Sequence, residues 1–138
     1  MTWTRRVLAA HPSAPEGDPD DRLADGACIE ACLAAAQACL TGADACLQED
    51  EALDLRACIR VQQNCADVCL ATAAVLSRTG SEAGPLIAAL VEACTEAVRE
   101  CEAVCARHAE TYRHCVLSAE ACLRCERACT ELIRAWAT

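Results

Sequence analysis

Fourteen of the 138 residues are cysteines, and their spacing is that of one face of an α-helix. Within each predicted helix, neighbouring cysteines are 3, 4 or 7 residues apart. Those gaps rotate the side chain by only about −60°, +40° and −20° around a helix axis. Four ladders of thiols result: Cys28, Cys32, Cys39 and Cys46; Cys58, Cys65 and Cys69; Cys94, Cys101 and Cys105; Cys115, Cys122, Cys125 and Cys129.

Thiolates in this number are ligands for soft metal ions, namely Cu(I), Zn(II), Cd(II) or the iron of iron–sulfur clusters. Zinc commonly takes Cys-x-x-Cys pairs from loops, whereas the only such pair here, Cys122 and Cys125, lies inside a predicted helix. Cu(I) accepts two or three bridging thiolates, and one monovalent ion per thiolate leaves the site neutral, whereas divalent ions in that ratio would bury a large charge. The pattern therefore favours several Cu(I) ions per chain.

Other uses of the thiols are less consistent with the sequence. A core lined by fourteen cysteines packs less well than one of leucine and is open to oxidation. Residues four apart on one helix bridge poorly as disulfides, and disulfides between helices need an oxidising compartment. The apolar stretch Val7 to Ala10 is too short for an export signal, so we expect a cytoplasmic chain with reduced thiols.

Two metal or thiol functions stay open as alternatives: a zinc or cadmium thiolate buffer, and a thiol-based redox or metal sensor with exposed, reactive cysteines. An enzyme is not expected, because the sequence lacks the Glu-x-x-His motif of di-iron bundles and a single Cys-x-x-Cys at a helix start. We predict no catalytic residues.

Composition excludes other partners. The net charge is −9, and the twelve basic residues, all arginine, are scattered along the chain, which disfavours nucleic acid. No uninterrupted run approaches the ~18 apolar residues that span a bilayer, so no membrane partner is expected.

The elements that must position the thiols are four helices of about 24–30 residues, predicted near 18–48, 50–78, 85–107 and 112–136. Asp18 with Pro19 and then Asp50 are predicted start signals, and Gly80 is a predicted stop. The fold class expected is all-α: an antiparallel four-helix bundle with an inward-facing, cysteine-lined core over 18–138. Residues 1–17 are predicted to be a flexible N-terminal tail with at most one weak helical turn around residues 5–10.

Alternating helix directions predict which cysteines share a level. Cys46, Cys58, Cys105 and Cys115 are expected at one end of the bundle, and Cys28, Cys69, Cys94 and Cys129 towards the other. An apolar plug is predicted beyond the second end, from Leu23, Val75, Leu76, Leu86, Ile87, Leu90, Leu132, Ile133 and Trp136. The first end is predicted to be a polar mouth with His108, His114, Asp50 and Asp54, where either histidine is a copper ligand or a solvated surface residue.

A second apolar stripe accompanies the thiols. We expect it to pack the helices together and in part to contact another subunit. Its members are Leu33, Leu40 and Leu47; Val61, Val68 and Val75; Leu90, Ala97 and Val104; Val116 and Leu123.

The Cys-x-x-x-Cys pairs and seven-residue steps on all four helices, with His108 and His114 near the third link, resemble the four-helix-bundle copper storage proteins, specifically their cytosolic branch. The resemblance covers about residues 19–137. It implies cuprous ions along the bundle core, a homotetramer and exchange with a cytosolic copper chaperone. Some relatives place methionine near the mouth; this chain has only Met1, which leaves any entry role to the two histidines. The function expected is cytosolic storage and detoxification of Cu(I).

Overall fold

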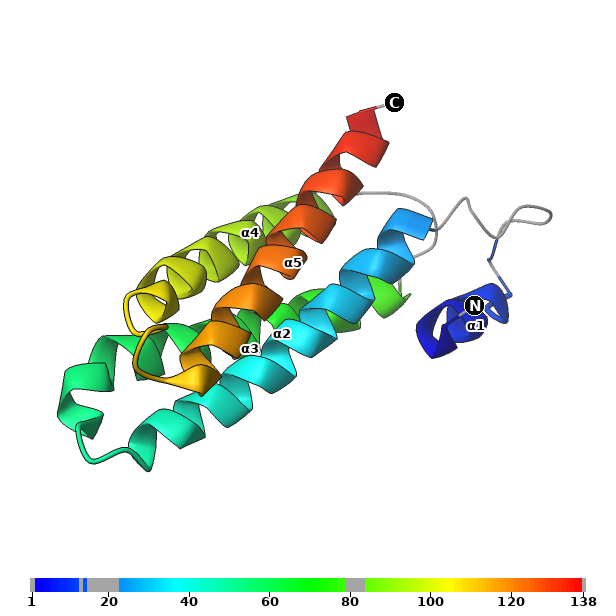
Figure 1. Ribbon diagram of the computed structural model, residues 1–138. Helices are drawn as coiled ribbons and strands as arrows, with labels where there is room; N and C mark the ends of the chain where they lie inside the picture. Colours follow the sequence, from blue (N-terminus) through cyan, green and yellow to red (C-terminus); the bar gives the residue numbers. More distant parts are fainter. Residues whose placement is uncertain (1, 13, 15–22, 79–83, 138) are drawn as a thin grey trace.

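The computed structural model describes residues 2–12, 14, 23–78 and 84–137. They form α1 (Trp3–Ala9), α2 (Leu23–Leu47), the short 3-10 helix η2 (Ala52–Leu55), α3 (Arg56–Arg78), α4 (Pro85–Ala106) and α5 (Arg113–Ala137), with no strand among these residues. The four long helices run antiparallel in sequence order, and α5 returns to pack against α2 as well as α4 (Figure 1). The predicted four-helix bundle is confirmed.

The predicted helix over 50–78 begins as a short 3-10 helix, η2, before α3. Residues 48–51 form the expected break, but η2 precedes α3, and its first flanking residue is Glu51 rather than a capping Asp50. Burial of Leu55 explains this extra turn, because η2 must fold back over α2 and α3 to place that side chain inside. The third predicted helix corresponds to α4, where Gly84 precedes Pro85 in the first turn. The predicted signals at Asp18, Pro19 and Gly80 lie outside the described residues.

The N-terminal segment is more ordered locally than one weak turn. α1 spans seven residues, the Thr2 hydroxyl accepts a hydrogen bond from the Arg5 amide, and Leu8 is buried against the bundle. Figure 1 shows α1 beside the beginning of α2. The division of the chain into a flexible tail over 1–17 and a bundle domain over 18–138 stays a prediction.

The apolar end of the bundle is smaller than predicted. Leu76, Ile87 and Leu132 are buried there, and Val75, Leu90 and Trp136 are half-buried. Leu23, Leu86 and Ile133 are 39%, 68% and 38% exposed and do not belong to the plug, because they face away from the bundle axis. The mouth end is also not free of apolar side chains, since the buried Leu55 lies there.

Helix α2 is the one described helix that is long and apolar enough to cross a membrane by length and composition alone. In this structure its cysteine face is buried against the other helices, as in the core helix of a bundle. Its apolar character is therefore accounted for by the bundle interior.

Candidate metal centre

All fourteen cysteines point into the bundle, where each is fully buried and none forms a disulfide. Each long helix contributes one face of thiols, so the predicted thiol-lined axis is confirmed. Whether a given cysteine binds metal stays a prediction at this point.

The sulfurs gather in four groups, in each of which all sulfur atoms lie within 4.8 Å of one another. The two groups of four take one cysteine from every long helix: Cys32, Cys69, Cys94 and Cys125, and next to it Cys39, Cys65, Cys101 and Cys122. Groups of three lie at the two ends: Cys28, Cys32 and Cys129 at one, and Cys46, Cys58 and Cys115 at the other.

The pairing of the outermost cysteines follows the predicted levels. The sulfurs of Cys28 and Cys129 are 3.8 Å apart, and those of Cys58 and Cys105 are 3.4 Å apart at the opposite end. These separations exceed the ~2.05 Å of a disulfide bond and are those of thiols in contact. An ion placed between such sulfurs has two or more soft ligands within reach, which is the environment that Cu(I) prefers.

A buried polar bridge interrupts the thiols near the mouth, and sequence reasoning missed it. Gln62 of α3 is fully buried, and its amide donates to the sulfurs of Cys58 and Cys46 at 3.4 and 3.6 Å. The Ser118 hydroxyl of α5 donates to the Gln62 carbonyl oxygen at 2.7 Å. The signal was present in the spacing, because Gln62 lies four residues after Cys58 on the same face.

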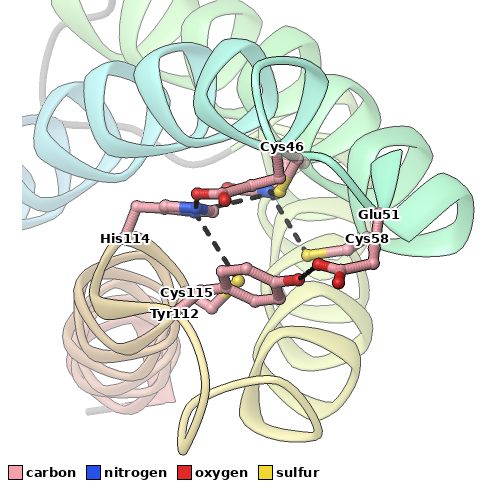
Figure 2. Close-up of polar contacts among 8 residues, drawn as sticks. Cys46, Glu51, Cys58, Tyr112, His114 and Cys115 are labelled. Atoms are coloured by element: carbon pink, nitrogen blue, oxygen red, sulfur yellow. Dashed lines mark hydrogen bonds and ion pairs between the residues drawn. The ribbon is translucent and has the colours of Figure 1, made fainter. Parts of the chain in front are cut away.

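His114 of α5 lies next to the outermost thiols at the mouth of the bundle. Its Nδ1 lies 3.7 Å from the Cys115 sulfur and 3.9 Å from the Cys46 sulfur, while its Nε2 is 3.1 Å from the Glu49 carboxylate (Figure 2). A carboxylate accepts hydrogen bonds, so Nε2 of His114 is the donor in this contact. Nδ1 then faces two thiols, as in metal-ligating histidines held by a carboxylate.

Further residues surround this histidine. The Tyr112 ring stacks on that of His114 with centroids 5.4 Å apart, and its hydroxyl donates to Glu51 at 2.8 Å (Figure 2). His108 is half-buried at the same end, and no hydrogen bond joins its side chain to a thiol in the described structure. Asp50 and Asp54 are exposed, so Glu49 and Glu51 are the mouth acids that make contacts.

Burial favours the neutral form of two thiols at the mouth, Cys46 and Cys115. Burial raises the pKa of Cys46, and it raises the pKa of Cys115 to about 12, because an apolar core disfavours thiolate. Cys105 shows the opposite effect, since hydrogen bonds from Cys101 and Cys58 stabilise its thiolate and lower its pKa to about 4. A metal cation entering this core replaces protons and supplies the positive charge that thiolates lack there.

The chain is similar to known copper storage proteins. The family described as copper storage protein matches residues 22–134. The structure of the copper storage protein Ccsp from Streptomyces lividans loaded with 10 copper equivalents superposes with a TM-score of 0.87 and 45% identity, covering 96% of this chain and 98% of that one.

Two other relatives agree. A structure described as copper loading to a cytosolic copper storage protein from Streptomyces lividans, with five coppers, has a TM-score of 0.81 and 49% identity over 85% of this chain and 98% of that one. The uncharacterized cysteine-rich protein YhjQ of Bacillus subtilis (strain 168) is 33% identical over 106 residues, which are 77% of this chain and 93% of that protein.

Proposed function

This chain belongs to the copper storage protein family, and we propose that it stores Cu(I) in the cytosol as several thiolate-bound ions along the core of its helix bundle. The observation that carries this function is the set of fourteen fully buried thiols without a disulfide, thirteen of which lie in four groups of three or four sulfurs. A store needs many equivalent soft ligands out of reach of water and oxidants, and this core supplies them. Detoxification follows from the same sequestration.

The alternatives are less well supported. A redox sensor needs accessible, reactive thiols, whereas every cysteine here is fully buried. The two four-cysteine groups have the ligand number that zinc prefers, so a zinc buffer is the comparison that the experiment must include. A storage role is not enzymatic, and the copper storage family to which the chain belongs supports such a role.

The fourteen cysteines are the proposed ligands, and His114 is proposed as an additional ligand at the mouth because its Nδ1 faces Cys46 and Cys115. His108 is the weaker candidate: no hydrogen bond joins it to a sulfur in the described structure, and its interaction with Cys105 is electrostatic. A homotetramer and a cytosolic copper chaperone as donor or acceptor are part of the proposal and rest on the family.

An anaerobic titration of the reduced protein with Cu(I), in competition with a chromogenic cuprous chelator, tests the function. We expect tight uptake of on the order of one Cu(I) per cysteine with unchanged helicity, because the thiols are already assembled. Zn(II) titrated in parallel is expected to bind more weakly. Saturation at one or two copper ions, or a preference for zinc at about one ion per four cysteines, would contradict storage of copper.

The same titration tests the histidine. His114→Ala is expected to retain the bulk capacity and to release the copper bound at Cys46 and Cys115 to the chelator more readily, because one of its ligands is lost. Identical chelator competition for the variant and the parent protein would remove His114 from the ligand set.

A further inference from the structure

Three of the four long helices lack a thiol at one common level of the core. At that level α2 has Gly42, α3 has Gln62 and α5 has Ser118, each one helical turn from a ladder cysteine. All four helices carry a cysteine on each side of this level, but only on α4 are the two, Cys101 and Cys105, four residues apart on one face with no other core position between them. The thiol core is therefore interrupted on three sides and continuous on one.

The interruption is a fixed polar bridge rather than an empty space. Ser118 donates to the Gln62 carbonyl oxygen at 2.7 Å, and the Gln62 amide nitrogen donates to the sulfurs of Cys58 and Cys46. A Cβ atom on Gly42 would overlap the polar atoms of both Gln62 and Ser118, so the glycine is what admits the bridge. Gln62 thus spans the core between α2, α3 and α5.

The bridge divides the cysteines into two sets. We call Cys46, Cys58, Cys105 and Cys115 the mouth thiols, and the ten others the deep thiols. Within the described residues, one sulfur–sulfur contact shorter than 4 Å joins the two sets, that between Cys101 and Cys105 at 3.9 Å. From Cys101 the contacts continue inward to Cys39 at 3.7 Å and from there to Cys122 at 3.8 Å.

From this geometry we infer that Cu(I) passes between the mouth thiols and the deep thiols by a single relay, from Cys105 to Cys101. The inference rests on the proposed function and adds the route by which the store fills. In the transfer a bond from copper to the Cys101 sulfur forms as the bond to the Cys105 sulfur breaks. Copper remains Cu(I), and the proton leaving the Cys101 thiol is taken up by the Cys105 sulfur.

The chemistry of the bridge explains why copper does not cross elsewhere. Cu(I) is a soft ion that binds sulfur in preference to amide or hydroxyl groups. Gln62 presents N–H groups to the mouth sulfurs, and its one oxygen is occupied by Ser118, so it offers no soft ligand. An ion moving along any helix except α4 would have to leave sulfur entirely for one turn, about 5.4 Å.

Stopped-flow loading with Cu(I) under anaerobic conditions tests the relay, with thiolate-to-copper absorption as the signal and withdrawal by a cuprous chelator as the reverse reaction. Cys105→Ser is expected to slow the phase assigned to the deep thiols at least ~10-fold in both directions, because a ligand-exchange step is lost. Cys115→Ser is the matched comparison: it also removes a proposed mouth ligand and weakens binding there, but its sulfur groups with Cys46 and Cys58 rather than with the deep thiols, so we expect it to slow the deep phase much less than Cys105→Ser does.

A rescue separates a route from mere damage to the fold. Gln62→Cys added to Cys105→Ser puts sulfur on α3 between Cys58 and Cys65 and is expected to restore deep loading, whereas Gln62→Asn in the same background is not. Cys101→Ser provides a second break of the route if Cys105→Ser alters the circular dichroism spectrum. Deep loading at the parent rate in Cys105→Ser, or equal slowing in Cys115→Ser, would overturn the relay. Failure of the parent protein to take up copper would instead overturn the proposed function.

Discussion

Gly42 is a core position at which no side chain larger than hydrogen fits without moving its neighbours. It is buried within α2, where glycine normally costs helix stability relative to alanine, and it faces the hydrogen bond between Ser118 and Gln62. The bridge therefore accounts for a residue that helix propensity alone would disfavour. Because position 42 is glycine, α2 has no thiol between Cys39 and Cys46.

We predict that Gly42→Ala lowers the free energy of unfolding of the reduced, copper-free protein by about 1–3 kcal/mol, since a buried side chain must displace the bridge. Urea denaturation followed by circular dichroism measures the change. Gly26→Ala is the control, because this glycine lies on the same helix and its added Cβ would meet the long Arg5 side chain at 3.2 Å and Leu8 at an ordinary contact distance of 3.7 Å. We expect Gly26→Ala to be neutral or stabilising. Equal stability of the two variants would show that the bridge is not fixed.

The thiols could be placed from sequence and their polar neighbours could not. A spacing of 3, 4 or 7 fixes a helix face, so the burial of all fourteen cysteines followed from the pattern. Gln62 and Ser118 share the cysteine spacing, but their hydrogen bond, like that of Tyr112, could not be predicted, because a polar residue on a helix reveals its partner only when the neighbouring helix is in place. His114 was predicted at the mouth, while its partner Glu49 was not.

At the scale of elements, the long helices were predictable and the short ones were not. Ladders of cysteine, alanine and leucine over more than twenty residues define α2 to α5, and Pro85 marks the start of α4. By contrast, α1 and η2 are too short to be stable alone, and they exist because Leu8 and Leu55 are buried against the bundle. Such contacts depend on the tertiary fold, which local sequence does not encode.

The residues of the second apolar stripe are buried on some helices and exposed on others. On α3 and α4 its members Val61 and Val104 are buried, as expected for packing between helices. On α2, Leu33, Leu40 and Leu47 are 45%, 52% and 55% exposed and lie seven residues apart, along one side of the helix. A straight row of three half-exposed leucines on a long helix is the part of the stripe available to a second copy of this chain.

We predict that Leu33→Gln with Leu40→Gln shifts the protein towards the monomer, because the row loses most of its apolar surface. Light scattering coupled to size-exclusion chromatography gives the mass of the parent and the variant. Leu53→Gln, which changes a leucine that is 76% exposed in η2 away from the row, is the control and is expected to keep the parent's mass. A parent that is monomeric at all concentrations, or a double variant with the parent's mass, contradicts association through α2.

The whole molecule is asymmetric along its axis. Leu76, Ile87 and Leu132 close one end, while His114 and its carboxylate partner lie over the thiols at the other. Copper is therefore expected to enter at the end that carries His114. The polar bridge then separates the four mouth thiols from the ten deep thiols. Burial of all fourteen thiols makes the stability of the copper-free protein sensitive to their deprotonation.

The copper-free protein is expected to lose stability at alkaline pH. Burial raises the pKa of the Cys115 thiol to about 12 in the folded state and raises that of Cys46. A group whose folded pKa is raised contributes its full stability below the unfolded pKa, near 9, and loses it as the pH rises towards the folded value. Each such thiol then costs about 1.4 kcal/mol per pH unit above pH 9, since the unfolded chain releases the proton that the folded chain retains.

Anaerobic urea denaturation at pH 7.5, 9 and 10.5, values chosen to bracket about pH 9, measures this loss. We expect the free energy of unfolding to fall steeply above about pH 9. The copper-loaded protein is the control, because its core holds cations in place of those protons and its stability should not fall over the same interval. Equal pH dependence of the empty and loaded forms would mean that the buried thiols titrate as freely when folded as when unfolded. A fall in the empty form alone identifies the proton as the species that copper replaces in this core.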